Sequence, residues 1–107
     1  MSEEKKSAEE VARDYAAAGG DAAARQLPKI DFSMFIFSLN SSVLVNLGVL
    51  EDPSGGKKSE NLAAARQTID ILSMLEEKTR GNLTKQEEDM LRHILYDLKI
   101  LYVKKAG

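Results

Sequence analysis

The stretch 78-KTRGNLTKQEEDM-90 decides how the chain folds, because it joins two long segments that have helical patterns. Gly81 suits the left-handed backbone conformation that closes a helix, and Lys78 and Arg80 place cations near that helix end. Thr84 followed by Glu87 makes a capping box, the arrangement that opens a helix. A connection this short makes the two helices neighbours, so the stretch predicts a helical hairpin.

Two functional interpretations of this stretch are weaker than the structural one. An anion site at the start of the second helix would use Lys78, Arg80 and Lys85, but acidic residues from Glu87 to Asp89 crowd that turn. A DNA-reading helix-turn-helix would present the same acidic residues to phosphates, which would repel them. We therefore interpret the stretch as a joint.

The two helices of the hairpin, predicted for 61–80 and 85–103, each have a broad apolar face. In the first helix this face comprises Leu62, Ala65, Ile69, Leu72 and Leu75, extended by Ile71 and Met74. In the second helix it spans an arc of about 140° and comprises Met90, Leu91, Ile94, Leu95, Leu98, Leu101 and Tyr102. A second, weaker strip lies opposite, formed by His93, Tyr96, Ile100 and Val103.

A third helix is predicted for 32–47, with Asp31 as its N-cap and Gly48 closing it. One side comprises Phe32, Phe35, Ile36, Leu39, Val43 and Leu47, and Met34, Phe37, Leu44 and Val45 point the other way. The chain has no charged residue from Phe32 to Leu50. A helix that is apolar all round must be covered all round, and two amphipathic helices cover only one side of it. We therefore expect a two-fold homodimer with this helix near its centre.

The predicted fold is all-α: a three-helix core of the hairpin plus the apolar N-terminal helix, completed by homodimerisation. The helical domain covers 31–104, with a loop at 49–60 and a tail at 105–107. Residues 1–30, rich in alanine and charge, are expected to form a mobile arm in which Ser7 and Glu10 could open a transient helix ending at Gly19 and Gly20. The candidate interface residues are Phe32, Met34, Phe35, Phe37, Leu44, Val45, His93, Tyr96, Ile100 and Val103.

Composition excludes several classes of function. The 107 residues carry a formal net charge of −2, without the basic excess of a nucleic-acid binder. The chain has no cysteine and a single histidine, so disulfides, thiolate metal sites and cysteine nucleophiles are excluded, and we expect no cofactor and no metal. The N-terminus lacks the apolar segment of a signal peptide, which leads us to expect a cytoplasmic protein.

His93 is the main candidate for chemistry, with Asp89 and Asp97 one helical turn to either side. An interface or surface histidine explains the same spacing, and the sequence contains no catalytic constellation. The uncharged segment that starts at Phe32 is long enough to consider a membrane span. Its serines and asparagines make it a poor one, so a membrane partner is not expected.

Several short motifs carry a resemblance to a known family. They are F-I-x-S-L from Phe35, L-G at Leu47, a D-P turn at Asp52, N-L-x-x-A-x-Q-T-I-D-I-L from Asn61, M-L-E-E-K-T-x-G-N-L-T from Met74, and L-Y-D-L-x-x-x-Y from Leu95. From Phe35 to Tyr102 the chain resembles the short bacterial proteins of the domain of unknown function 1844 family. Lys99 stands where that family tends to have arginine, which weakens any bidentate contact there. The resemblance implies a small helical bacterial cytosolic protein with no assigned activity, so no functional residue carries over.

The sequence therefore favours a non-enzymatic, homodimerising interaction or adaptor module with an unidentified protein partner. One alternative is a small-ligand or enzymatic site across the dimer, built from His93, Tyr96 and Asp97. A second is association with a membrane surface through the helix predicted for 32–47.

Overall fold

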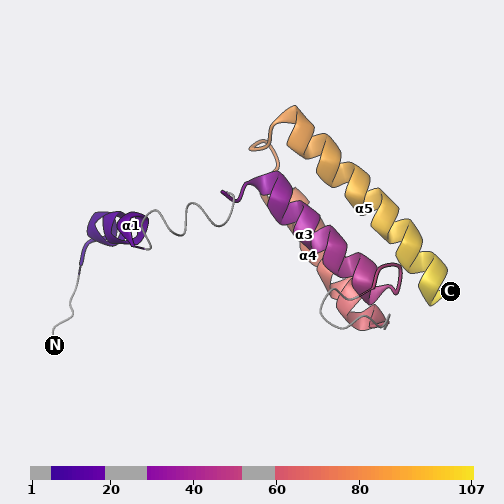
Figure 1. Cartoon of the computed structure of the whole chain (residues 1–107). Coiled ribbons are helices and arrows are strands. Elements are labelled where there is room, and N and C mark those ends of the chain that lie inside the picture. Colours follow the sequence, from indigo (N-terminus) through magenta and orange to yellow (C-terminus); the bar gives the residue numbers. More distant parts are fainter. Residues whose placement is uncertain (1–5, 19–28, 52–59) are drawn as a thin grey trace. The chain divides into compact units, whose positions relative to one another are not determined.

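The computed structural model describes residues 6–18, 29–51 and 60–107. The chain divides into two units, Met1–Ile30 and Asp31–Gly107. The first unit contains α1 (Ala8–Ala17), and the second contains α3 (Phe32–Asn46), α4 (Leu62–Lys78) and α5 (Lys85–Ala106) (Figure 1). The described residues contain helices and no strands, which confirms the predicted all-α class.

Helix α1 begins with a complete capping box. Glu10 N donates to Ser7 Oγ at 3.1 Å, and Ser7 N donates to Glu10 Oε1 at 3.0 Å. Ala18 is the C-cap, with its N–H bonded to the Asp14 carbonyl at 2.9 Å. The helix end predicted at Gly19 and Gly20 lies outside the described residues, and the mobility of the arm stays a prediction.

Helix α3 begins after a capping residue, and a glycine in the left-handed backbone conformation follows its end. Asp31 accepts a hydrogen bond from Met34 N at 2.8 Å, which satisfies one of the free amides at the N-terminus. The helix ends at Asn46, one residue earlier than predicted, because Leu47 is the C-cap. Gly48 follows with φ +80, and its N–H donates to the Val45 carbonyl at 3.0 Å. The chain thus turns back immediately after α3.

The joint between α4 and α5 begins earlier in the chain than predicted. Helix α4 ends at Lys78, two residues early, because Arg80 N bonds the carbonyl of Glu77, three residues back, in a tighter turn. Gly81 then takes φ +84. Thr84 opens α5: its Oγ1 accepts from Glu87 N at 3.1 Å, and its own N–H donates to Glu87 Oε1 at 2.9 Å. Helix α5 continues to Ala106, three residues beyond the predicted end.

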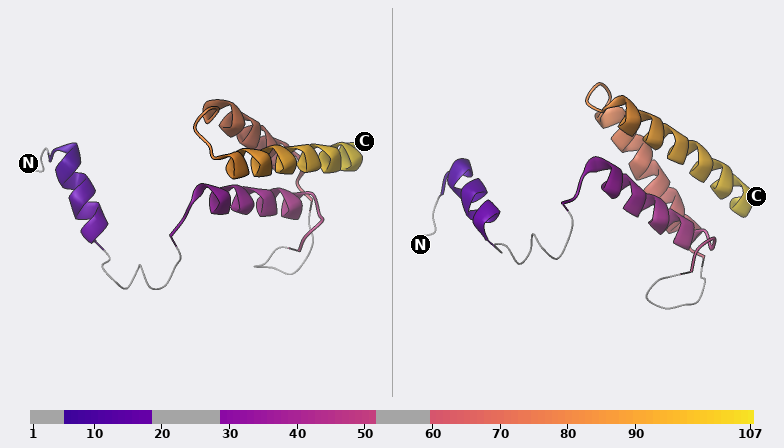
Figure 2. Two further views of the ribbon diagram at one scale, coloured as in Figure 1. Left: turned by 90° about the horizontal axis from the view of Figure 1, so that it is seen from above. Right: turned by 45° about the horizontal axis from the view of Figure 1, so that its top comes forward.

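The three helices of the second unit form an up-down-up bundle in which α4 runs opposite to α3 and α5 (Figures 1 and 2). The joint closes one end of the bundle. At the other end, Asn61 N donates to the Asn46 carbonyl at 2.8 Å, which joins the start of α4 to the end of α3. Lys105 Nζ lies 2.9 Å from Glu60 Oε2, which joins the last turn of α5 to the same place.

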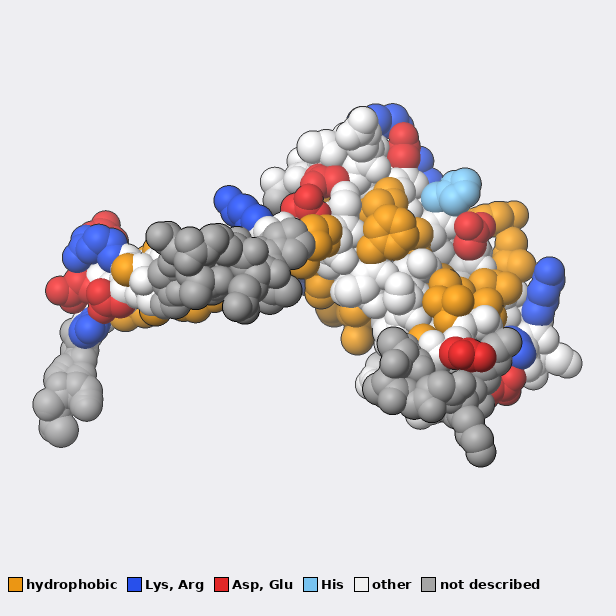
Figure 3. Space-filling view, in the orientation of Figure 1, with side chains coloured by type: hydrophobic (Ala, Val, Ile, Leu, Met, Phe, Trp, Pro, Cys, Tyr) orange, Lys and Arg blue, Asp and Glu red, His pale blue; other side chains and the backbone are white. Residues whose placement is uncertain are grey.

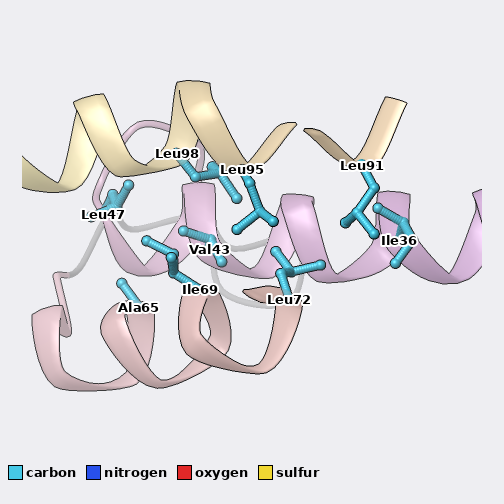
Figure 4. Packing of buried hydrophobic residues seen from close by; sticks show 9 residues of the cluster. All are labelled: Ile36, Val43, Leu47, Ala65, Ile69, Leu72, Leu91, Leu95 and Leu98. Atoms are coloured by element: carbon cyan, nitrogen blue, oxygen red, sulfur yellow. The ribbon is translucent and has the colours of Figure 1, made fainter. Parts of the chain in front are cut away.

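The core is made of aliphatic side chains that point toward one another from all three helices (Figure 4). Its buried members are Ile36, Val43 and Leu47 of α3 and its C-cap, Ala65, Ile69 and Leu72 of α4, and Leu91, Leu95 and Leu98 of α5. Burial of each large aliphatic side chain contributes roughly 1.5–3 kcal/mol, so this cluster is the main stabilising feature of the bundle. No polar or charged side chain among the described residues is buried with it.

The predicted apolar face of α5 and the main part of that of α4 pack in or against this core, which confirms the prediction for them. Ile71 and Met74, predicted to extend the face of α4, are exposed. In α3 the buried face is rotated about the helix axis relative to the predicted one. Leu44, expected to point outward, packs against the core, and Phe35, expected to point inward, is exposed. The buried line of α3 runs through Ile36 and Val43, so Phe35 and Leu44 lie on its two flanks about 100° from it. Most of the loop predicted for 49–60, including the D-P turn, lies outside the described residues.

Candidate interaction surfaces

The outer side of α3 is the first candidate surface. Met34, Phe35 and Phe37 are exposed there, Phe37 by 57%. Helical geometry places Met34, Ser38 and Val45 opposite the buried line of the helix. The Ser38 hydroxyl donates to the Phe35 carbonyl at 2.7 Å, so this polar group is already satisfied within the helix. Figure 3 shows several separate hydrophobic patches on the face of the second unit that is turned toward the viewer.

Two of the candidate interface residues on α3 have another role. Phe32 and Leu44 are partly buried and pack against the core, so their apolar surface is already largely covered within the bundle. Val45 is half-buried. The surface that α3 offers to a partner is therefore centred on Met34, Phe35 and Phe37, toward the N-terminal end of the helix.

The second candidate surface is the outer strip of α5. Tyr96 is 65% and Val103 is 66% exposed, and Ile100 between them is also exposed. These three residues line a shallow, almost wholly apolar groove of about 390 Å³ together with Lys99 and Lys104. The sequence prediction named the strip but missed the two lysines, although helical spacing places both along its edges.

A neighbouring groove of about 330 Å³ lies between α4 and α5 and shares Lys99 and Val103 with the first. The guanidinium of Arg66 lies 5.4 Å from the centre of the Tyr102 ring, a cation–π contact. Arg66 also pairs with Asp70 at 3.6 Å, so its charge is shared with a carboxylate of its own helix. No sequence pattern predicts this groove, because Arg66 and Tyr102 lie on different helices.

His93 lies at the start of the α5 strip. Its side chain is 81% exposed, and its Nε2 lies 3.8 Å from Asp97 Oδ2, one turn further along. Asp89, expected as its second partner, pairs instead with Lys85 at 3.1 Å. An imidazole this exposed has no surrounding wall against which a substrate could be held, so its geometry is that of a surface histidine.

A third groove, of about 400 Å³, lies at the joint and includes Arg80, Arg92, Glu76 and Glu88 in its lining. Lys85, considered for an anion site there, lies in the ion pair with Asp89. Arg92 lies 3.7 Å from Glu88 and 3.5 Å from Asp89. Because the groove carries carboxylates as well as cations, it has no net attraction for an anion.

In residues 6–18, 29–51 and 60–107, no three His, Asp or Glu side chains come close enough together to hold a metal ion. None of the described helices combines the length and the apolar character that crossing a membrane requires.

Comparison with protein families agrees with the motifs of the sequence. The model of the family described as domain of unknown function (DUF1844) matches residues 29–104 of the chain. Comparisons with curated proteins and with solved structures gave no match. The matched range begins just before Asp31, where α3 is capped, and includes α3, α4 and all but the last two residues of α5. The chain therefore belongs to the DUF1844 family.

Proposed function

We propose that this chain is a non-enzymatic interaction module that forms a two-fold homodimer through the outer side of α3. One observation carries the proposal: a helix with no charged residue presents Met34, Phe35 and Phe37 to solvent. An exposed group of large apolar side chains is typical of a surface where a protein binds a partner. The occupant that we propose is the same surface of a second copy.

A second copy fits this surface for two reasons. The outer side of α3 has neither acidic nor basic residues, so two copies meet without repulsion, and a charged partner would gain no ion pair there. The small side chains of Ser38 and Ser41 let two helices approach closely while the exposed phenylalanines pack at their sides. A two-fold arrangement uses the same patch twice and closes on itself.

Sedimentation equilibrium on the full chain over a micromolar concentration series tests this proposal. We expect the mass of a dimer for the wild type and of a monomer for Ser41→Arg, which places like charges on the proposed interface, one helical turn from Phe37. Gln67→Arg is the matched control, since Gln67 is exposed on α4 and outside the proposed surface, and it should remain a dimer. A wild-type monomer across the whole series would remove the proposal, and an unaffected Ser41→Arg dimer would place the interface elsewhere.

A further inference from the structure

We infer that the groove on α5 docks an amphipathic helix of another protein, one whose apolar seam is flanked by acidic residues. The inference rests on the proposed role of the chain as an interaction module. It concerns α5 instead of α3, and a helix of another protein instead of a second copy. It adds the chemistry of the partner to the proposal.

The spacing of the strip is the first argument. His93, Tyr96, Ile100 and Val103 follow one another at steps of three, four and three, the pattern of the a and d positions in a coiled coil. The opposite side of α5 is already used, because Leu91, Leu95 and Leu98 are buried in the core. The strip therefore lies outside the buried core. It offers a straight seam about 16 Å long to a second helix.

The charges beside the seam are the second argument. Lys99 and Lys104 line the groove and occupy the g and e positions, the two positions that select the partner of a helix. Neither lysine forms an ion pair with any residue in the described part of the chain, whereas Lys85 and Lys105 do. A partner helix with glutamate or aspartate at its own flanking positions would meet both lysines.

A second copy of α5 fits this groove less well than an acidic helix does. In a parallel pair, Lys99 of one chain would face Lys104 of the other. In an antiparallel pair with the two seams fully overlapped, Lys99 would face Lys99 and Asp97 would face Asp97. Both arrangements oppose like charges, which weakens pairing. Two copies of the uncharged surface on α3 would meet without such repulsion.

A membrane surface also fits less well. Helices that lie in a membrane interface bury a broad apolar face, whereas this strip has one apolar residue per turn. Asp97 lies beside the seam between Tyr96 and Ile100, where it would be repelled by the anionic lipids that attract the lysines. The narrow seam matches the contact of one helix with another.

Fluorescence anisotropy with the full chain tests the inference. The probe is a labelled helical peptide of three heptads, with leucine at both seam positions and glutamate at both flanking positions. Its twin carries lysine in place of every glutamate. We expect the glutamate peptide to bind several-fold more tightly than the lysine peptide, because it gains ion pairs with Lys99 and Lys104 against one repulsive contact with Asp97. Equal affinity for the two peptides would overturn the inference.

A charge exchange makes the test specific to this groove. The double variant Lys99→Glu, Lys104→Glu should reverse the preference and bind the lysine peptide more tightly. Val103→Ser should weaken the binding of both peptides, while Met74→Ser on α4, the matched control for loss of an exposed apolar side chain, should weaken neither. A preference that survives the double variant would overturn the inference. Binding of the wild type to vesicles containing anionic phospholipid, without any peptide preference, would favour the membrane instead and also overturn it.

Repeating the titration with Ser41→Arg separates this inference from the proposed homodimer. A monomeric variant that still prefers the glutamate peptide would support docking on α5 without requiring self-association. A wild-type dimer that fails to distinguish the peptides would leave the α3 interface standing and remove the α5 site. A chain that neither dimerises nor distinguishes the peptides would remove both proposals.

Discussion

Gly81 shows how a single residue shapes the joint. It has φ +84, and a Cβ added to it would meet no other atom within 4 Å. A side chain there therefore costs only the strain of the left-handed backbone. We expect Gly81→Ala to lower the free energy of unfolding by about 1 kcal/mol, and Gly81→Asn to lower it less, since asparagine tolerates this conformation. Urea denaturation followed by circular dichroism measures both, and equal losses would contradict the account.

Gly48 differs from Gly81 because a side chain added to it would meet Glu60. Its φ is +80, and an added Cβ would lie 2.9 Å from Glu60 Cγ, the side chain that pairs with Lys105. Gly48→Ala must therefore displace Glu60 as well as strain the backbone. It should lower the denaturation midpoint further than Gly81→Ala does. An equal shift for the two variants would mean that Glu60 moves aside without lowering the stability of the bundle.

Helix α5 has two faces with opposite roles. Leu98 is buried and Ile100, two residues later, is exposed on the other side. Leu98→Ala should lower the free energy of unfolding by roughly 2–5 kcal/mol, because it leaves a cavity in the core. Ile100→Ala should change it by less than about 1 kcal/mol. Thermal and urea denaturation of the pair measures this contrast, and similar losses would mean that the strip helps to hold the bundle together.

The contrast between the two faces also explains what could be predicted from the sequence. In α4 and α5, charged residues mark the outside, so periodicity alone found the residues that the structure buries. In α3 nothing is charged, and the pattern lacked the contrast needed to orient the helix. Phe35 was placed inward and Leu44 outward for that reason. The caps at Asp31 and Thr84 were visible because each bond joins residues three apart.

Contacts between residues far apart in the sequence could not be predicted from its patterns. Lys105 pairs with Glu60, Arg66 stacks on Tyr102, and Asn61 bonds the Asn46 carbonyl. No local period or motif contains such pairs, because they depend on how three helices are packed together. The groove between α4 and α5 is a product of the same packing, so it too could be found only in three dimensions.

The division of the chain into two units leads to a last prediction. All buried core residues lie between Ile36 and Leu98, and the first unit ends at Ile30. Residues 31–107 should therefore fold without the first unit, with a free energy of unfolding within about 0.5 kcal/mol of the full chain. Urea denaturation and amide hydrogen exchange of both forms measure this. A truncated chain that loses cooperative unfolding, or protection in α3, would show that residues 1–30 contribute to the bundle. A truncated chain that keeps both would assign the bundle's stability to residues 31–107.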